Sequence, residues 1–177
     1  MKTFIYIAAS LDGFIARKDG NLDWLDEIPN PGKDDFGFNE FMQKIDAVVM
    51  GKNTYEKVMT FKKWPYLKPV FILSSTIKSI PDELKKKVEI MKGNPKHILD
   101  SLSDAGFNNF YIDGGATIRN FLKEDLIDEL IITRIPVLLG DGIPLFQTLP
   151  HELKFEHVKT DVYNNGLVKS HYIKKRD

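Results

Sequence analysis

The sequence predicts a single α/β domain over residues 1–177, built as a three-layer α/β/α sandwich around a mixed, mostly parallel sheet. Short apolar runs rich in β-branched residues alternate with amphipathic segments, which is typical of a sheet covered by helices on both faces. The chain ends differently. Asn164-Asn165-Gly166 separates two segments of strand character, and Asn-Gly favours a tight hairpin, so the last two strands are predicted to be antiparallel.

The apolar runs and the helical periodicity place the individual elements. The predicted strands are residues 4–9, 47–51, 70–75, 88–91, 110–113 and 129–139, followed by the hairpin strands 154–163 and 167–175. The predicted helices are residues 35–45, 55–59, 95–105 and 116–124. In the first of these, Phe38, Phe41, Met42 and Ile45 recur at helical spacing and form one apolar face.

Composition excludes several classes of protein. Lys plus Arg equals Asp plus Glu, 25 of each, so net charge does not favour nucleic acid or an acidic membrane as a partner. The absence of cysteine excludes disulfides, thiolate metal sites and cysteine nucleophiles, and it fits a cytoplasmic protein. The apolar stretch 4–9 is too short for a signal peptide or a membrane span and fits a buried first strand.

The four histidines do not predict a metal site. They are scattered along the chain, and His151 and His157 lack the i, i+4 spacing of a helical zinc pair. We therefore expect no bound metal.

The segment "VVMGKNTYEKV" (48–58) is typical of an anion-binding junction. An apolar strand ends at Gly51-Lys52, Asn53 is placed to cap the next helix, and Glu56 completes a capping box. Backbone N–H groups at such a helix start, next to a lysine, favour an anion. A capped helix without a ligand is the alternative. The nucleoside-triphosphate P-loop does not match, because Asn53 stands where Ser or Thr is required and Asp46 where glycine is required.

A second junction strengthens the case for a ligand. "FYIDGGATIRNFL" (110–122) is another strand that ends in a glycine pair, Gly114-Gly115, before a helix. "LSST" (73–76) is a third strand end and supplies hydroxyl groups. Ligands of open α/β sheets collect at the carboxyl ends of the strands. These segments together predict an extended ligand that carries more than one phosphate.

The same segments resemble a known superfamily. "MGKNTYE" (50–56), "ILSS" (72–75) and "IDGGATI" (112–118) resemble motifs of the dihydrofolate reductase superfamily. "ASLDGFIA" (9–16), "PVLLGDGIPLF" (136–146) and "NNGLVKSHY" (164–172) resemble the branch that contains the riboflavin-biosynthesis reductase domain and its stand-alone bacterial relatives. These motifs occur in family order over essentially the whole chain. The resemblance implies a reductase that binds NADPH in an extended form.

The resemblance also assigns cofactor-binding residues. It implies that the diphosphate and the 2′-phosphate contact Gly51, Lys52, Asn53 and Thr54, that the adenosine side contacts Leu73, Ser74 and Ser75, and that the diphosphate and nicotinamide ribose contact Gly114, Gly115, Ala116 and Thr117. A cation at Lys52 would favour NADPH over NADH, because only NADPH carries the extra phosphate.

Three carboxylates are candidates for the catalytic acid. By resemblance, Asp35 takes the place of the cleft carboxylate of the dihydrofolate reductases, with helix capping by Asp34 or Asp35 as the alternative. Asp12 lies in "SLDG", which is also a common turn sequence. Asp113 precedes the glycine pair, where the riboflavin branch has an acidic residue. Trp24 is expected to line the substrate cleft, although a packing role fits it equally well.

The function that follows is an NADPH-dependent reductase of a small heterocyclic substrate (pteridine or ribosylaminopyrimidine-like) or of a carbonyl substrate. The resemblance implies a homodimer as well. A true dihydrofolate reductase is one alternative, although "LDW" (22–24) lacks the proline of the folate enzymes. A non-catalytic NADP-binding regulatory or scaffold protein is another. The chain has no cysteine for a zinc deaminase domain, which excludes deamination.

Overall fold

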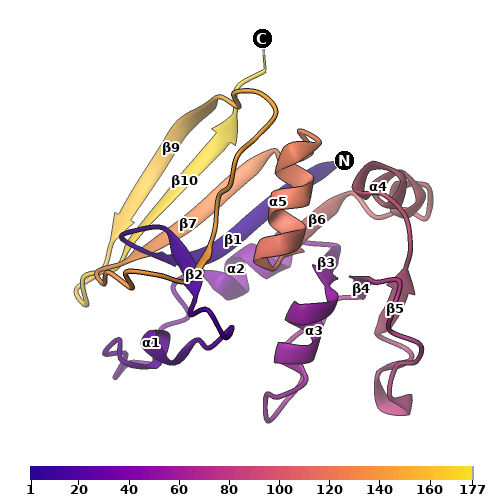
Figure 1. The fold of residues 1–177 in the computed structure, drawn as a ribbon, viewed down its shortest axis with the longest axis horizontal. Helices are drawn as coiled ribbons and strands as arrows, with labels where there is room; N and C mark the ends of the chain where they lie inside the picture. The colour runs from indigo at the N-terminus through magenta and orange to yellow at the C-terminus, as the bar shows by residue number, and fades with distance from the viewer. Residues whose placement is uncertain (177) are drawn as a thin grey trace.

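The computed structural model describes residues 1–176 and has the elements of an α/β fold (Figure 1). The strands are β1 (Lys2–Ser10), β2 (Phe14–Ala16), β3 (Ala47–Gly51), β4 (Val70–Leu73), β5 (Val88–Met91), β6 (Asn109–Asp113), β7 (Glu129–Ile135), β8 (Ile143–Pro144), β9 (Phe155–Val162) and β10 (Val168–Lys174). The helices are α1 (Asp23–Asp26), α2 (Phe38–Lys44), α3 (Lys52–Val58), the 3₁₀ turn η1 (Asp82–Leu84), α4 (Pro95–Asp104) and α5 (Gly115–Lys123).

One sheet organises the molecule. Its strand order is β5-β4-β3-β6-β1-β7-β10-β9, and a separate ribbon pairs β2 with β8. The strands from β5 to β7 run parallel, whereas β10 is antiparallel to both β7 and β9. This confirms the predicted mixed, mostly parallel sheet that ends in an antiparallel hairpin.

Helices cover both faces of the sheet, as the apolar strands require. Ile98 and Leu102 of α4 and Phe121 of α5 belong to a buried cluster on one face. Phe41 of α2 and Val58 of α3 belong to a second buried cluster on the other face. Figure 1 shows this arrangement, with α5 in front of the sheet and α2 behind it. The three predicted layers are confirmed.

Local backbone geometry explains why two predicted boundaries were wrong. The helix predicted to start at residue 35 starts at Phe38, because Phe36 (φ 53°) and Gly37 (φ 88°) adopt left-handed conformations that a helix cannot include. The strand predicted to run to residue 139 ends at Ile135, since Pro136 has no N–H to continue the ladder.

The start of α3 also differs from the prediction. The helix begins at Lys52, directly after the strand, and its N-cap is Gly51 without a side-chain hydrogen bond. The expected capping box with Asn53 as the N-cap was therefore wrong. The short helix α1 and the ribbon of β2 and β8 were not predicted, because elements of two to four residues have no clear periodicity.

Candidate functional site

The two glycine junctions lie side by side. Strands β3 and β6 are direct neighbours, with Met50 paired to Asp113, so Gly51 and Gly114 leave the sheet at the same edge. Each glycine also packs against the threonine of the other junction. An ideal Cβ on Gly51 would lie 2.8 Å from the Thr117 Oγ1, and one on Gly114 would lie 1.9 Å from the Thr54 Oγ1. The two junctions therefore interlock, and neither glycine can carry a side chain without a shift of its neighbour.

A cavity of about 700 Å³ opens at this edge of the sheet. The residues that line it include every one that the family resemblance assigned to the cofactor: Gly51, Lys52, Asn53, Thr54, Leu73, Ser74, Ser75, Gly114, Gly115, Ala116 and Thr117. The parallel order of β3, β4 and β6 brings these three strand ends together.

The cavity also contains polar residues that the sequence analysis missed. Lys57, Lys92, Arg119 and Asn120 line it. Lys92 follows β5, a fourth parallel strand of the same sheet. Because ligands of open α/β sheets bind at the carboxyl ends of the strands, its position after this strand was a signal that could have predicted it. Lys52 itself is 3.6 Å from the Glu56 carboxylate, an exposed ion pair one helical turn away.

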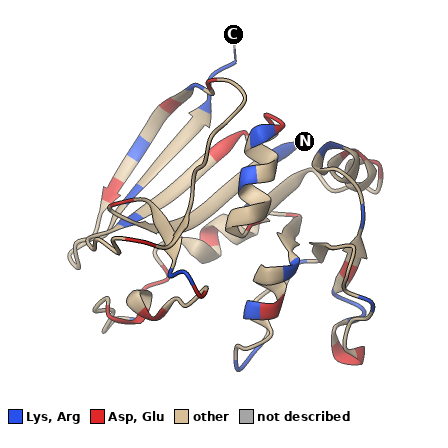
Figure 2. Ribbon diagram, in the orientation of Figure 1, with Lys and Arg blue, Asp and Glu red and all other residues tan. Residues whose placement is uncertain are grey.

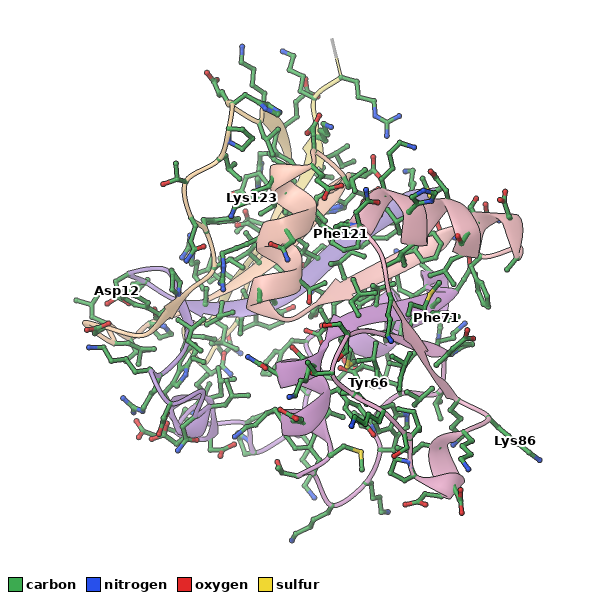
Figure 3. All side chains as sticks on the ribbon, turned by 45° about the vertical axis from the view of Figure 1, so that its right-hand side comes forward. Asp12, Tyr66, Phe71, Lys86, Phe121 and Lys123 are labelled. Carbon is green, nitrogen blue, oxygen red and sulfur yellow. The ribbon has the colours of Figure 1, made fainter. Side chains whose placement is uncertain are left out.

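Asp113 is the candidate acid that lines this larger cavity. The Tyr66 hydroxyl donates a hydrogen bond of 2.7 Å to its Oδ2. Burial is the main influence on this carboxyl and raises the pKa of Asp113, while hydrogen bonds from Tyr66 and from the Gly114 backbone act in the opposite direction. Tyr66 is only 6% exposed and lies inside the molecule near α3 (Figure 3). The site therefore holds a carboxyl group that keeps its proton to higher pH than an ordinary aspartate does.

Asp12 has a different environment and lines neither cavity. It lies in an outer loop (Figure 3) and accepts hydrogen bonds from the Ser10 hydroxyl and from the backbone N–H groups of Leu139 (3.2 Å) and Gly140 (2.7 Å). These bonds, with that of Ser10 first, lower the pKa of Asp12. Asp12 thus ties the loop after β1 to the loop after β7, in agreement with the turn alternative.

Asp35 lines a second, smaller cavity of about 220 Å³ on the α2 side of the sheet. Its two carboxylate oxygens accept hydrogen bonds of 2.9 Å from the backbone N–H groups of Gly37 and Asn39. Those bonds lower the pKa of Asp35. The carboxylate therefore stabilises the start of α2, as the capping alternative states, although Gly37 occupies the N-cap position.

The Phe36 carbonyl oxygen anchors the loop that carries Asp35. It accepts hydrogen bonds from the Tyr6 hydroxyl (2.7 Å), the Tyr163 hydroxyl (3.1 Å) and the Lys169 ammonium (2.6 Å). These donors come from β1, the hairpin loop and β10. The C-terminal hairpin thereby holds one wall of the smaller cavity, which no local sequence pattern indicated.

Trp24 is placed differently from the prediction. It is 2% exposed, packs with Ile135 and Leu167, and is absent from the lining of both cavities. Its neighbours Leu22 and Leu25 line the larger cavity instead. The structure supports the packing alternative for Trp24, because on this short helix the indole is directed into the protein.

Three further properties of the described residues concern metal ions, membranes and surface charge. Residues 1–176 contain no group of three or more His, Asp or Glu side chains that could hold a metal ion. Within the same residues, no helix has the length and apolarity that crossing a bilayer requires. Figure 2 shows basic and acidic residues alternating along β9 and α3 rather than gathering on one face.

Comparison with known proteins identifies the family. Residues 2–169 match the RibD C-terminal domain. The protein YwjB of Bacillus subtilis is 40% identical over 176 residues, which cover 98% of each chain. A crystal structure of a riboflavin biosynthesis protein, described as putative, from Shewanella sp. PV-4 has a TM-score of 0.95 at 49% identity and covers 99% of this chain and 100% of that one.

The fold extends to dihydrofolate reductase. The enzyme from Enterococcus faecalis, in complex with NADP(H) and RAB-propyl, has a TM-score of 0.68 at 21% identity and covers 99% of this chain and 97% of that one. An identity this low shows a shared fold alone. The match over residues 2–169 shows more: the chain belongs to the RibD C-terminal domain family, with the fold of dihydrofolate reductase, and the family supports an oxidoreductase of the reductase type.

Proposed function

We propose that the protein is an NADPH-dependent reductase that transfers a hydride to a small heterocyclic substrate, pteridine or ribosylaminopyrimidine-like, or to a carbonyl substrate. The interlocked junctions at Gly51 and Gly114, which open on one cavity of about 700 Å³, are the observation that carries this proposal. They bring two glycine-bearing strand ends within reach of the same dinucleotide. The Enterococcus faecalis enzyme with NADP(H) has the same fold.

The residues present fit this cofactor. Gly114 at the start of α5 makes no side-chain cap, so the first N–H groups of this helix stay available for a diphosphate. Lys52, Lys57 and Lys92 line the same cavity and supply positive charge for the diphosphate and the 2′-phosphate. When bound, NADPH supplies the hydride.

The smaller cavity is the proposed substrate site. It adjoins the larger cavity, because Ala8 and Leu25 line both. A substrate seated in the smaller cavity would therefore extend past these two side chains into the larger cavity, which Asp113 lines and which would hold the dinucleotide. The smaller cavity combines the aromatic rings of Tyr6 and Phe36 with polar groups such as Thr133, a lining that suits a flat, polar heterocycle.

Of the three candidate acids, the geometry favours Asp113 as the proton donor. A general acid must carry its proton when the substrate reacts, and burial raises the pKa of Asp113, so that this carboxyl keeps a proton to higher pH than an ordinary aspartate does. The pKa of Asp35 is lowered by backbone N–H groups, so this residue is better suited to hold the wall of the substrate site. Asp12 lines neither cavity.

A thermal shift experiment with NADPH, NADP⁺ and NADH tests cofactor binding. NADPH and NADP⁺ should raise the melting temperature more than NADH does, because at equal concentration a ligand that binds more tightly stabilises the folded state more. Equal shifts would contradict the preference for the 2′-phosphate. NADPH oxidation with dihydrofolate or with a ribosylaminopyrimidine then separates the reductases. Cofactor binding without turnover of any substrate would instead support the non-catalytic alternative.

We also propose a homodimer in the cytoplasm. The edge strand β9 supports the dimer, because Val158 is 48% exposed and Val162 is 74% exposed, and within residues 1–176 no strand pairs with the outer side of β9. The cysteine-free sequence supports a reducing compartment. Sedimentation equilibrium that gives a mass near 20.3 kDa at all concentrations would contradict the dimer.

A further inference from the structure

Asp113 is chemically isolated in the larger cavity. Among the cavity-lining residues of the described chain it is the only carboxylic acid, and none of those residues is a histidine. Its carboxyl accepts the Tyr66 hydrogen bond of 2.7 Å. Tyr111, on the same strand, also faces the carboxyl, and its hydroxyl donates to the Tyr6 carbonyl at 3.0 Å. The groups in direct contact with Asp113 are therefore neutral.

The charged groups around Asp113 belong to other elements. Lys52 and Lys57 come from α3, Lys92 follows β5, and Arg119 comes from α5. The Arg119 guanidinium is turned toward β8, where it donates a hydrogen bond of 2.5 Å to the Pro144 carbonyl. Burial, rather than any of these cations, is the main influence on Asp113, and it raises the pKa of the carboxyl.

A bound dinucleotide changes this balance in a defined direction. The diphosphate would lie against Gly114 and Gly115, the two residues that directly follow Asp113. Its negative charge disfavours a carboxylate nearby, and the bound ligand removes water from the same wall. Both effects favour the protonated acid.

We propose that Asp113, held in place by the Tyr66 hydroxyl, takes up a proton when NADPH binds. The carboxyl group would then hold the proton that the reduction consumes. This inference rests on the proposed function. Reduction of a C=N or C=O bond adds a hydride to carbon and a proton to nitrogen or oxygen. The O–H bond of Asp113 would break as the new N–H or O–H bond forms, which would leave Asp113 as a carboxylate, and NADPH would supply the hydride.

In this account Tyr66 is a positioning residue. It comes from the loop between α3 and β4, is buried, and donates its hydrogen bond to one oxygen of the Asp113 carboxyl. Its hydrogen bond stabilises the carboxylate. The bond thereby sets the pH range in which Asp113 is ionised in the free protein and can still accept a proton on binding.

Isothermal titration calorimetry with NADPH tests the inference without a substrate. In two buffers of different ionisation enthalpy, the observed binding enthalpy should differ by an amount that reports an uptake of up to one proton. Asp113→Asn should abolish the part of the uptake that Asp113 contributes, and Asp113→Glu should retain it. The 2′-phosphate of NADPH has a pKa of about 6 and can also exchange protons on binding. The quantity to compare is therefore the difference in proton uptake between the native protein and Asp113→Asn.

Two tyrosine variants test the role of Tyr66. Tyr66→Phe removes a bond that stabilises the carboxylate, so the pH window of proton uptake should move to higher pH. Tyr55→Phe is the matched control, because Tyr55 is buried in the same cluster but does not line the cavity. Its window should match that of the native protein. An unmoved window in Tyr66→Phe would overturn the positioning role.

The outcomes separate this inference from the proposed function. A buffer dependence of the NADPH binding enthalpy that is the same in the native protein and in Asp113→Asn would overturn proton uptake by Asp113 and leave the reductase proposal standing. A failure of NADPH to bind the native protein would overturn the proposed function, and this inference with it.

Discussion

Thr54 occupies the space that a side chain at Gly114 would need, because an ideal Cβ on Gly114 lies 1.9 Å from the Thr54 Oγ1. The reverse contact joins Gly51 to Thr117. Each junction thus has the order glycine, two residues, threonine, and each threonine packs on the glycine of the other junction. These contacts join the two segments that the proposed cofactor must touch, so substitutions at either glycine test how the two segments pack against each other.

The contact of Gly51 with Thr117 predicts a rescue. Gly51→Ala should lower the free energy of unfolding by about 1–3 kcal/mol, because its methyl group would lie too close to the threonine oxygen. Gly51 has an ordinary φ of −87°, so crowding is the main cost. Adding Thr117→Ala should recover much of the loss in a double-mutant cycle, measured by urea denaturation. Additive losses would show that the two side chains do not compete for space.

Gly114→Ala should be more damaging. The backbone φ of 89° is left-handed, and the threonine Cβ would remain 3.1 Å away even without its hydroxyl. We expect a loss of about 2–4 kcal/mol, from crowding and backbone strain together. Gly106→Ala is the control, since Gly106 has a φ of 97° and nothing within 4 Å of an ideal Cβ. That variant should lose only about 1 kcal/mol. Equal losses in chemical denaturation would remove the role of crowding.

Lys52 should contribute to the choice of cofactor. Lys52→Met is expected to weaken NADPH binding by about 5-fold or more, since a charge-assisted bond to phosphate is worth about 1–3 kcal/mol. NADH binding should change little. Fluorescence titration with both cofactors measures the ratio. Lys86→Met is the control, because Lys86 points away from the molecule (Figure 3) and is exposed. An unchanged ratio of the NADPH and NADH affinities would indicate that Lys57 or Lys92, rather than Lys52, favours the 2′-phosphate.

Lys169 should control the loop that carries Asp35. Lys169→Met removes one of the donors to the Phe36 carbonyl and a positive charge that lowers the pKa of Asp35. The pKa of Asp35 should therefore rise, and the amides of Gly37 and Asn39 should exchange faster with deuterium. Carboxyl NMR titration and hydrogen exchange measure these effects. Lys159→Met is the matched control for Lys169→Met, because Lys159 also forms an ion pair with Asp161 but is exposed. A similar change in both variants would contradict the role of the hydrogen bond from Lys169 to the Phe36 carbonyl.

Asp12 should make stability depend on pH in the acid range. The pKa of Asp12 is lowered in the folded state, first by the Ser10 hydroxyl. Its contribution is therefore present above the ordinary pKa of about 3.9 and is lost as pH falls through the lower folded value. Asp12→Asn should be less stable than the native protein at neutral pH and should approach it below about pH 3. Asp104→Asn, at the exposed end of α4, is the control. A constant difference in stability across pH would contradict this role.

Much of the lining of the larger cavity could be predicted because its signals are local. A strand that ends at Gly51-Lys52 or at Gly114-Gly115 carries the information for its own junction, and the strand runs were long enough to place both. The acids were harder to rank. Asp12, Asp35 and Asp113 each follow a recognisable motif, but their environments depend on burial and on partners such as Tyr66, 47 residues before Asp113 along the chain.

The sequence by itself determined the α/β class, the C-terminal hairpin and the strand ends that line the larger cavity, because periodicity and turn residues act over a few neighbouring positions. Only the tertiary structure decided that β6 lies between β3 and β1, which brings Gly51 beside Gly114. It also decided that Asp113 is the acid in that cavity and that the hairpin holds Phe36. Strand order, desolvation and hydrogen bonds between distant residues arise from packing of the whole chain, which no short segment encodes.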